Sequence, residues 1–175
     1  QTKEAKLERV IEICRKERGD GIIYVSSRRD TESIAKMLMD RGVHAVPYHA
    51  GLDQSIRAAN QDKFMSGQAR VVVATVAFGM GVNKANVRFI VHVVAPRSLE
   101  AYAQESGRAG RDGDPARCIL LVSPHDRTQL VMNARRDEMD LPALRRVYGQ
   151  LMRQAKGSWV IADPSFLRAP AGEED

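Results

Sequence analysis

Short uninterrupted apolar runs alternate with amphipathic stretches along most of this chain, and this alternation restricts the possible folds more than any other feature. Runs of strand length lie at residues 21–26, 43–48, 70–75, 87–94 and 116–122. Apolar side chains at helical spacing lie at residues 2–17, 30–41, 53–65, 98–107 and 124–136, and Asp30 can cap the second of these stretches. Strands that are apolar throughout are buried on both faces, as in a parallel sheet covered by helices. The sequence therefore predicts an α/β fold with a doubly wound, mostly parallel sheet and helices on both faces.

The alternating pattern predicts one domain, expected to comprise residues 1–138. With 43% hydrophobic residues, the 175-residue chain has enough apolar material for one core of ordinary size. Residues 139–168 contain a stretch of helical spacing, and we expect them to form a helical extension. Residues 169–175 combine Pro, Gly and acidic side chains, so a disordered tail is expected there.

The charge balance slightly favours a polyanionic partner such as nucleic acid. The chain has 27 Lys and Arg against 22 Asp and Glu, a formal net charge of +5. No apolar stretch approaches the roughly 18 residues of a membrane span, and no secretion signal is visible, so no membrane partner is expected. The first residue is Gln1 rather than Met, which suggests a piece of a longer protein.

The cysteines and histidines do not form a metal-binding pattern. Cys14 and Cys118 are far apart, and neither belongs to a C-x-x-C pair. Both lie in apolar stretches, so we expect two buried free thiols in a reducing compartment. His49 has no carboxylate or cysteine at a ligand spacing and is as readily explained as a structural hydrogen-bonding residue. Neither zinc nor another metal is predicted in this chain.

Two arginines three residues apart follow the helical stretch that ends at residue 107. Residues 104–113 read QESGRAGRDG, so Arg108 and Arg111 can point to the same side among small neighbours. Guanidinium groups match phosphate oxygens in both geometry and charge. On these residues alone, a glycine-rich helix end with solvated arginines remains an equal alternative.

Polar or glycine-containing loops follow several predicted strands, where ligands of parallel sheets are usually bound. In residues 71–83, Gly79 and Gly81 would let the main chain approach a phosphodiester closely. Phe78 and Met80 in the same loop could face a ligand or pack in the core. Hydroxyl and guanidinium groups follow the first strand at residues 26–29.

These segments, taken in order, resemble the second RecA-like motor lobe of superfamily 2 helicases, and specifically the RecQ family of DNA helicases. Residues 104–113 are similar to motif VI in its RecQ form, and residues 73–84, VATVAFGMGVNK, are similar to motif V. Residues 24–29, YVSSRR, and 48–52, YHAGL, resemble motifs IV and IVa. The resemblance covers roughly residues 21–124.

The resemblance implies the second lobe of an ATP-dependent 3′-to-5′ DNA helicase, and it implies roles for individual residues. Arg111 corresponds to the arginine finger that reaches the γ-phosphate of ATP, Arg108 to its neighbour, and Gln104 to a residue that orients the site. The ATP site would also include Gly79, Gly81 and Asn83, which link it to the DNA-contacting loop. The DNA contacts would come from Ser27, Arg28, His49, Gly51, Thr75, Phe78 and Met80.

The chain departs from the family in two ways. No cysteine follows Cys118, although RecQ proteins usually continue into a four-cysteine zinc module. The phosphate-binding motif G-x-x-x-x-G-K-[ST] and the D-E-x-H motif are also missing from the sequence. ATP and Mg²⁺ would therefore be held mainly by a first RecA-like lobe of the same polypeptide, and this lobe alone is not expected to be active.

The expected partners are that first lobe and single-stranded or duplex DNA. The expected location is the cytoplasm or nucleoid, or the nucleus in a eukaryote. Two alternatives stay open, namely a non-catalytic nucleic-acid-binding module and the lobe of an RNA helicase. The second is disfavoured because a DEAD-box RNA helicase would usually have His-Arg where this chain has Gln104-Glu105.

Overall fold

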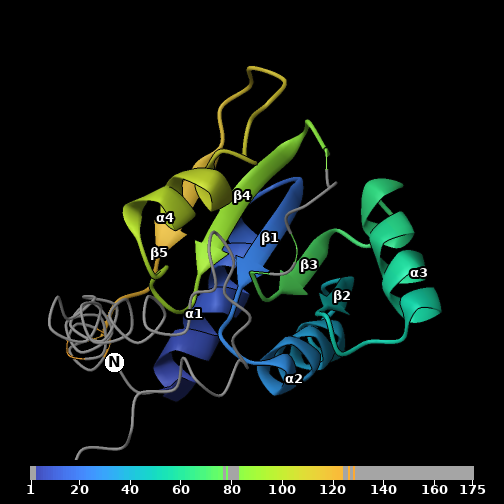
Figure 1. The fold of residues 1–175 in the computed structure, drawn as a ribbon, viewed down its shortest axis with the longest axis horizontal. Coiled ribbons are helices and arrows are strands. Elements are labelled where there is room, and N and C mark those ends of the chain that lie inside the picture. Colours follow the sequence, from blue (N-terminus) through green and yellow to red (C-terminus); the bar gives the residue numbers. More distant parts are fainter. Residues whose placement is uncertain (1–2, 77, 79–82, 124–125, 127, 129–175) are drawn as a thin grey trace, which may run out of the picture. The chain divides into compact units, whose positions relative to one another are not determined.

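The computed structural model describes residues 3–76, 78, 83–123, 126 and 128, and in this part of the chain it shows one parallel sheet (Figure 1). The 5-stranded sheet has the order β2-β3-β1-β4-β5. Its strands are β1 (Asp20–Tyr24), β2 (Ala45–Tyr48), β3 (Val71–Ala74), β4 (Val87–His92) and β5 (Arg117–Leu120). The helices are α1 (Lys3–Lys16), α2 (Arg28–Asp40), α3 (Gln54–Met65) and α4 (Leu99–Ser106). Each strand predicted from the sequence is present, slightly shorter than expected.

The chain divides into two units, Gln1–Val131 and Met132–Asp175, and the structure described here belongs to the first. The predicted helix at residues 124–136, the extension at 139–168 and the tail at 169–175 lie wholly or largely outside the described residues. No helix in the described part of the chain is long and apolar enough to cross a membrane.

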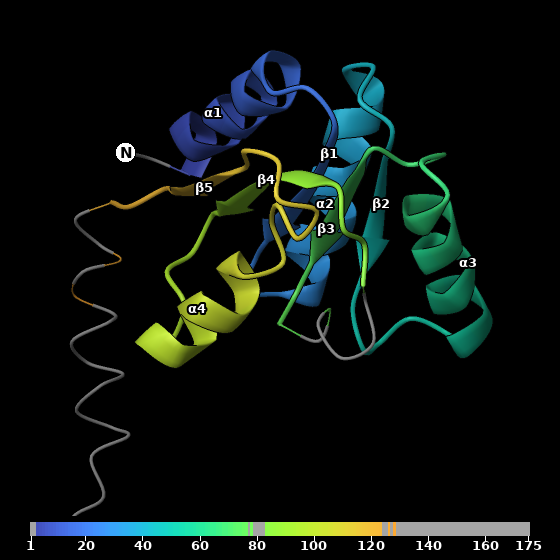
Figure 2. The ribbon, with the colours of Figure 1, turned by 90° about the horizontal axis from the view of Figure 1, so that it is seen from above.

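Helices cover both faces of the sheet, so the doubly wound α/β prediction is confirmed. On one face, α1 and α2 pack against the strands, with Ile11, Leu38 and Phe89 in a shared core. On the other face, Phe64 of α3 packs in a second core that includes Ile90. Figure 2 shows α1 and α4 on opposite sides of the sheet. The apolar runs of β1, β2, β3 and β4 are continuous because each of these strands contributes side chains to both cores.

Two local expectations were wrong. Helix α2 is capped by Ser27, whose Oγ accepts a hydrogen bond from the Asp30 backbone N–H at 3.0 Å. The helix begins before Asp30, which places this carboxylate in the first turn, where it interacts favourably with the helix dipole. Cys14 is buried as expected, but Cys118 is exposed. Cys118 lies on β5, an edge strand with only β4 beside it, so an apolar run there does not imply burial.

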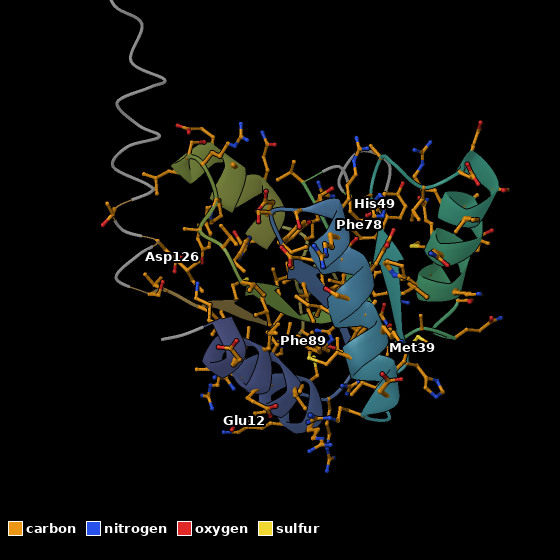
Figure 3. All side chains as sticks on the ribbon, turned by 90° about the horizontal axis from the view of Figure 1, so that it is seen from below. Glu12, Met39, His49, Phe78, Phe89 and Asp126 are labelled. Atoms are coloured by element: carbon orange, nitrogen blue, oxygen red, sulfur yellow. The ribbon has the colours of Figure 1, made fainter. Side chains whose placement is uncertain are left out.

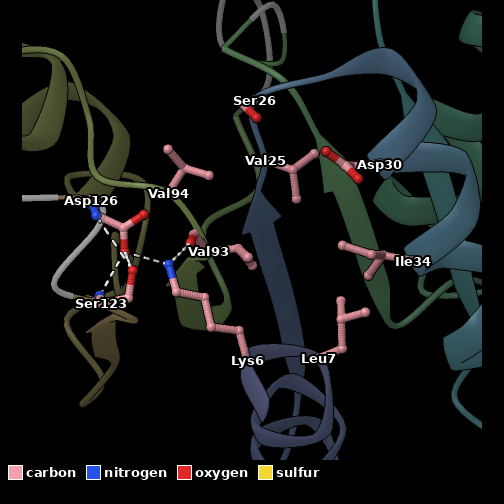
Figure 4. A pocket seen from close by; sticks show the side chains of 10 residues that line it. All are labelled: Lys6, Leu7, Val25, Ser26, Asp30, Ile34, Val93, Val94, Ser123 and Asp126. Carbon is pink, nitrogen blue, oxygen red and sulfur yellow. Dashed lines mark hydrogen bonds and ion pairs between the residues drawn. The ribbon is translucent and has the colours of Figure 1, made fainter. Parts of the chain in front are cut away.

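A mostly buried ion pair connects α1 to the segment after β5. Lys6 Nζ donates to Asp126 Oδ2 at 2.5 Å and to the Val93 carbonyl at 2.9 Å. The Ser123 backbone N–H and hydroxyl both donate to Asp126 Oδ2 at 2.6 Å. These groups line a cavity of about 270 Å³ at the ends of β1 and β4, with apolar walls that include Leu7 (Figure 4).

The ion pair gives the stability of this domain a defined pH dependence. Desolvation raises the pKa of Asp126, but the bonds from Lys6 and Ser123 outweigh it and lower the pKa from 3.8 to about 2. We predict that Asp126→Asn lowers the free energy of unfolding at pH 7 by about 2 kcal/mol. The deprotonated carboxylate stabilises the fold above its ordinary pKa, so the difference from wild type shrinks as the pH falls from about 4 towards about 2. Urea unfolding of the wild type and of Asp126→Asn across this pH range measures the difference in the free energy of unfolding.

Glu12→Gln is the matched control for this substitution. Glu12 pairs with Arg9 at 2.7 Å, but the two side chains are 62% and 59% exposed. Exposed ion pairs contribute about 0.5 kcal/mol or less, so this variant should unfold like wild type at each pH. A pH-independent loss for Asp126→Asn would contradict the proposed origin of the stability.

Candidate functional site

The carboxyl ends of four strands form a single row, which positions the predicted site residues directly after β1, β2 and β3 along one edge. The parallel register aligns Tyr48 with Ala74, Ala74 with Tyr24, and Tyr24 with His92. The loops after these strands therefore begin side by side. In Figure 3, His49 and Phe78 lie near one end of α2, and Met39 lies near the other end.

Arg111 is held in an exposed position by contacts on two sides. Its Nε donates to the Gly107 carbonyl at 3.1 Å, and its Nη1 donates to Asn83 Oδ1 at 2.9 Å. Gly107 ends α4, and Asn83 lies in the segment before β4. The structure thus joins the two predicted motifs through Arg111 and Asn83. These contacts leave the second terminal guanidinium nitrogen, Nη2, without a hydrogen bond among the described residues. Nη2 can therefore face a ligand.

Arg108 is half-buried and incompletely bonded. Its Nε is buried and has no hydrogen-bond partner among the described residues. A buried donor without a partner is costly, and an oxygen of a bound phosphate would supply the missing acceptor. The arginine pair therefore fits an anionic phosphoryl ligand. Gln104, four residues earlier, is exposed on the last turn of α4.

The loop between the two arginines depends on a glycine. Gly110 has φ +61°, and a Cβ there would lie 2.7 Å from the Asp114 carbonyl oxygen. The Gly110 backbone N–H donates to the Val87 carbonyl at 3.0 Å, which ties the loop to the first residue of β4. The loop can therefore turn back against the sheet only without a side chain at this position.

Phe78 packs in the core, which is one of the two possibilities that the sequence left open. It is 1% exposed, and its ring lies edge-on to Tyr48 and Phe64, with centroids 4.6 Å and 5.9 Å away. Thr75 is half-buried directly after β3. Gly79, Met80 and Gly81 lie outside the described residues, so their predicted roles stay predictions.

Arg28 and Gly51 are adjacent, although they follow different strands. Arg28 is the first residue of α2, after the capping Ser27, and is exposed. A Cβ on Gly51 would lie 2.9 Å from both Cδ and Nη1 of Arg28, so the missing side chain lets the guanidinium lie against this loop. The two residues present one cationic surface at the edge of the sheet.

The buried His49 side chain supports the cationic surface formed by Arg28 and Gly51. The ring is 3% exposed, Nδ1 accepts from the Gly51 N–H at 3.1 Å, and Nε2 lies 3.0 Å from Glu32 Oε1. A carboxylate accepts hydrogen bonds, so the proton is on Nε2 and both ring nitrogens are engaged within the protein. His49 therefore positions the Gly51 loop, and its direct contact with DNA stays a prediction.

The sequence did not reveal Glu32, Glu105, Tyr24 or His92 as parts of this edge. Glu105 of α4 is buried and lies 2.8 Å from His92 Nε2, measured from its Oε2. The only sequence signal for Glu105 is its place beside Gln104 in residues 104–113. The signal for Tyr24 is that it begins residues 24–29, which resemble motif IV, whereas His92 lies inside the predicted strand 87–94 without a separate signal.

The two arginines of the site offer electrostatic chemistry. No group of three or more His, Cys, Asp or Glu residues in the described segments could hold a metal ion. The two arginines offer rigid, permanently charged donors, which can stabilise negative charge that develops on a phosphoryl group.

Comparisons with known proteins show the family of this chain. The model of the helicase conserved C-terminal domain matches residues 3–113, and the chain belongs to this family. RecQ, an ATP-dependent DNA helicase of Haemophilus influenzae, is 53% identical over 106 residues, which make up 61% of this chain and 17% of that protein. The resemblance to RecQ helicases is confirmed, and the chain spans only a small part of such a relative.

Solved structures share the fold. The E. coli DEAD-box protein SrmB, solved in complex with regulator of ribonuclease activity A, has a TM-score of 0.67 and 25% identity, covering 77% of this chain and 80% of that one. The Mycobacterium smegmatis helicase Lhr, bound to ssDNA and AMP-PNP, has a TM-score of 0.63 and 25% identity, covering 74% and 18%. The described sheet is therefore the RecA-like lobe that the sequence predicted.

The loop around Gly110 gives a test of the arginine geometry. We predict that Gly110→Ala lowers the free energy of unfolding more than Gly113→Ala does, and that the two losses differ by about 1 kcal/mol or more. Both glycines have positive φ, +61° and +88°, so both alanines carry the backbone penalty of about 1 to 2 kcal/mol. Only Gly110 has atoms within 4 Å of the added Cβ. Equal losses in urea unfolding would show that the contact with Asp114 is unimportant.

Proposed function

We propose that this chain is the second motor lobe of a RecQ-like ATP-dependent 3′-to-5′ DNA helicase. The observation that carries the proposal is the arrangement of the arginines. Arg111 is held by Gly107 and Asn83 at the exposed edge, beside Arg108 with its unpartnered Nε. The identity to RecQ over this same region supports DNA as the substrate, and the polarity follows from the family resemblance alone.

In this proposal, Arg111 is the arginine finger of the ATPase. ATP and Mg²⁺ would be held mainly by the first lobe, and Arg111 and Arg108 would contact the phosphate groups across the cleft between the lobes. A finger stabilises the charge on the transferring phosphoryl group, which is worth about 10³ to 10⁵ in rate in other nucleotide hydrolases. Asn83 and Gly107 keep the guanidinium in place before ATP binds, so little reorganisation is needed.

The proposed DNA grip lies at the carboxyl ends of the strands. Arg28 and the Gly51 loop present a positive surface there, and Thr75 adds a hydroxyl group after β3. Ser27 precedes Arg28 at the same edge, where its hydroxyl bonds to Asp30 Oδ2 at 2.7 Å. Contacts of this kind are made to phosphates, so they hold any sequence equally, as a translocating motor requires. The structure of Lhr with ssDNA and AMP-PNP supports the view that a lobe of this fold can serve both ligands.

The first prediction concerns Arg111 in the full-length protein that contains this chain. Arg111→Ala should lower DNA-stimulated ATP hydrolysis at least a hundredfold, roughly, because stabilisation of the transferring phosphoryl group is lost. Binding of single-stranded DNA should change by less than about threefold. Steady-state ATPase assays and fluorescence anisotropy measure the two quantities.

Arg117→Ala is the control, since Arg117 is exposed on β5 and bonds to Glu17, away from the arginine pair. It should retain wild-type turnover. Unchanged turnover in Arg111→Ala would remove the finger assignment. A wild-type protein that binds DNA but hydrolyses no ATP would instead be a nucleic-acid-binding module, and preferential stimulation by RNA would make it an RNA helicase.

The second prediction concerns the two ends of α2. Arg28→Ala should weaken single-stranded DNA binding about fivefold and reduce the slope of log affinity against log salt by about 0.7, the value for one phosphate contact. Arg41→Ala removes the same charge directly after the last residue of α2, at the opposite edge of the sheet. Equal effects of both substitutions would show that net charge, and not this surface, holds the DNA.

A further inference from the structure

A buried polar cluster lies between the two halves of the proposed site. Its members are Tyr24 at the end of β1, His92 at the end of β4, and Tyr102 and Glu105 of α4. The His92 ring stacks on Tyr24 with centroids 5.2 Å apart and an interplanar angle of 19°, and it lies 5.4 Å from the Tyr102 ring. His92 is 0% exposed and Glu105 is 8% exposed. None of these residues belongs to the phosphate or DNA contacts proposed above.

Glu105 and His92 fix the last turn of α4 on the sheet. The 2.8 Å separation of His92 Nε2 and Glu105 Oε2 requires a proton between them, which the imidazole donates. A buried carboxylate without such a donor would be strongly destabilising, so the pair holds Glu105 at one place above β4. Arg108 follows Glu105 by only three residues, so the same bond fixes where the arginine segment begins.

Tyr24 connects this pair to the loop after β3. Its hydroxyl donates to the Phe78 carbonyl at 3.2 Å. Burial raises the pKa of Tyr24 to about 12, and the positive charge of Arg108 opposes this effect. Ala109 packs against the core that contains both Tyr24 and Phe78. One side chain therefore contacts the strand-end loop on one side and the arginine segment on the other.

We infer that Tyr24, His92 and Glu105 are positioning residues that set the place of Arg108 and couple it to the loop after β3. The inference rests on the proposed function, because it assigns the loop to the DNA side and the arginines to ATP. A displacement of Phe78 caused by DNA binding would be transmitted to Arg108 through the Tyr24 hydroxyl. The Glu105–His92 bond would hold α4 in place, so that a movement of this helix does not cancel the displacement. The cluster thereby makes ATP hydrolysis responsive to DNA.

The main test is Tyr24→Phe in the full-length protein, with Tyr48→Phe as its matched control. Both tyrosines are the last residues of parallel strands in the same sheet and are buried, and the Tyr48 hydroxyl bonds to Gln61 Oε1 at 3.3 Å, away from the arginines. The measured quantity is the ratio of ATP turnover with saturating single-stranded DNA to turnover without it. This ratio does not depend on the active fraction, so a merely structural loss leaves it unchanged.

Tyr24→Phe should lower this ratio at least fivefold, roughly, and Tyr48→Phe by less than about twofold, with both KM values for ATP near wild type. In an Arg108→Ala background, Tyr24→Phe should have no further effect on the ratio, because residues that act through one another are not additive. Additive losses in this double-mutant cycle would overturn the inference.

Glu105 provides an independent variant. Glu105→Gln keeps an acceptor oxygen for His92 Nε2 and should retain the ratio within about threefold, whereas Glu105→Ala should lower it about tenfold. If Arg111→Ala abolishes turnover but Tyr24→Phe and Glu105→Ala behave like Tyr48→Phe, the inference fails and the proposed function stands. If the wild-type protein shows no DNA-stimulated hydrolysis, the proposed function itself fails.

Discussion

The parallel register of the buried sheet is the constraint on which the site depends. It ends β2, β3, β1 and β4 in one row, so segments far apart in the sequence leave the sheet at the same edge. A shift by one residue would exchange the side chains of the two cores, for example Ile22 on one face and Ile23 on the other. The packing that stabilises the fold therefore also determines which loops meet. Arg28 follows β1 at this edge, whereas the Arg111 segment follows α4 and is bonded through Gly110 to Val87, the first residue of β4, at the other end of that strand.

Two histidine–glutamate pairs show how this edge is supported. His49 follows β2 and bonds to Glu32 of α2, and His92 ends β4 and bonds to Glu105 of α4. In each pair, a buried imidazole from a strand end holds a carboxylate from the helix that covers it. Buried polar groups require partners, so each pair fixes one helix relative to the sheet. Arg28 thus lies exposed beside His49, a buried group whose two ring nitrogens bond within the protein.

The sequence was sufficient for the fold and for the candidate residues, but not for their surroundings. Apolar runs and motif order predicted the strands, the sheet and both arginines, because each depends on local spacing. What the sequence missed concerns tertiary packing. Cys118 lies in a strand-like run, yet the edge position of β5 leaves it exposed. For Phe78 and His49 the sequence left two possibilities open, and in the structure Phe78 packs on Tyr48 and Phe64 while both ring nitrogens of His49 are bonded within the protein. Glu105 carried no separate signal, because its partner is thirteen residues away on another element.

The central place of β1 explains why we assign to Tyr24 the connection between the loop after β3 and the arginine segment. β1 pairs with β3 on one side and with β4 on the other, so Tyr24 reaches Phe78 after β3 and also the His92 ring of β4. A close-packed interior has few alternative arrangements, so a displacement on one side moves the neighbouring side chains as well. An exposed loop would instead change its own conformation and transmit little of the displacement. A motor lobe needs its nucleic-acid contacts and its phosphate contacts to respond to each other. A buried hydroxyl and a stacked ring provide this link with side chains that folding has already ordered, so no further ordering entropy opposes the response when a ligand binds.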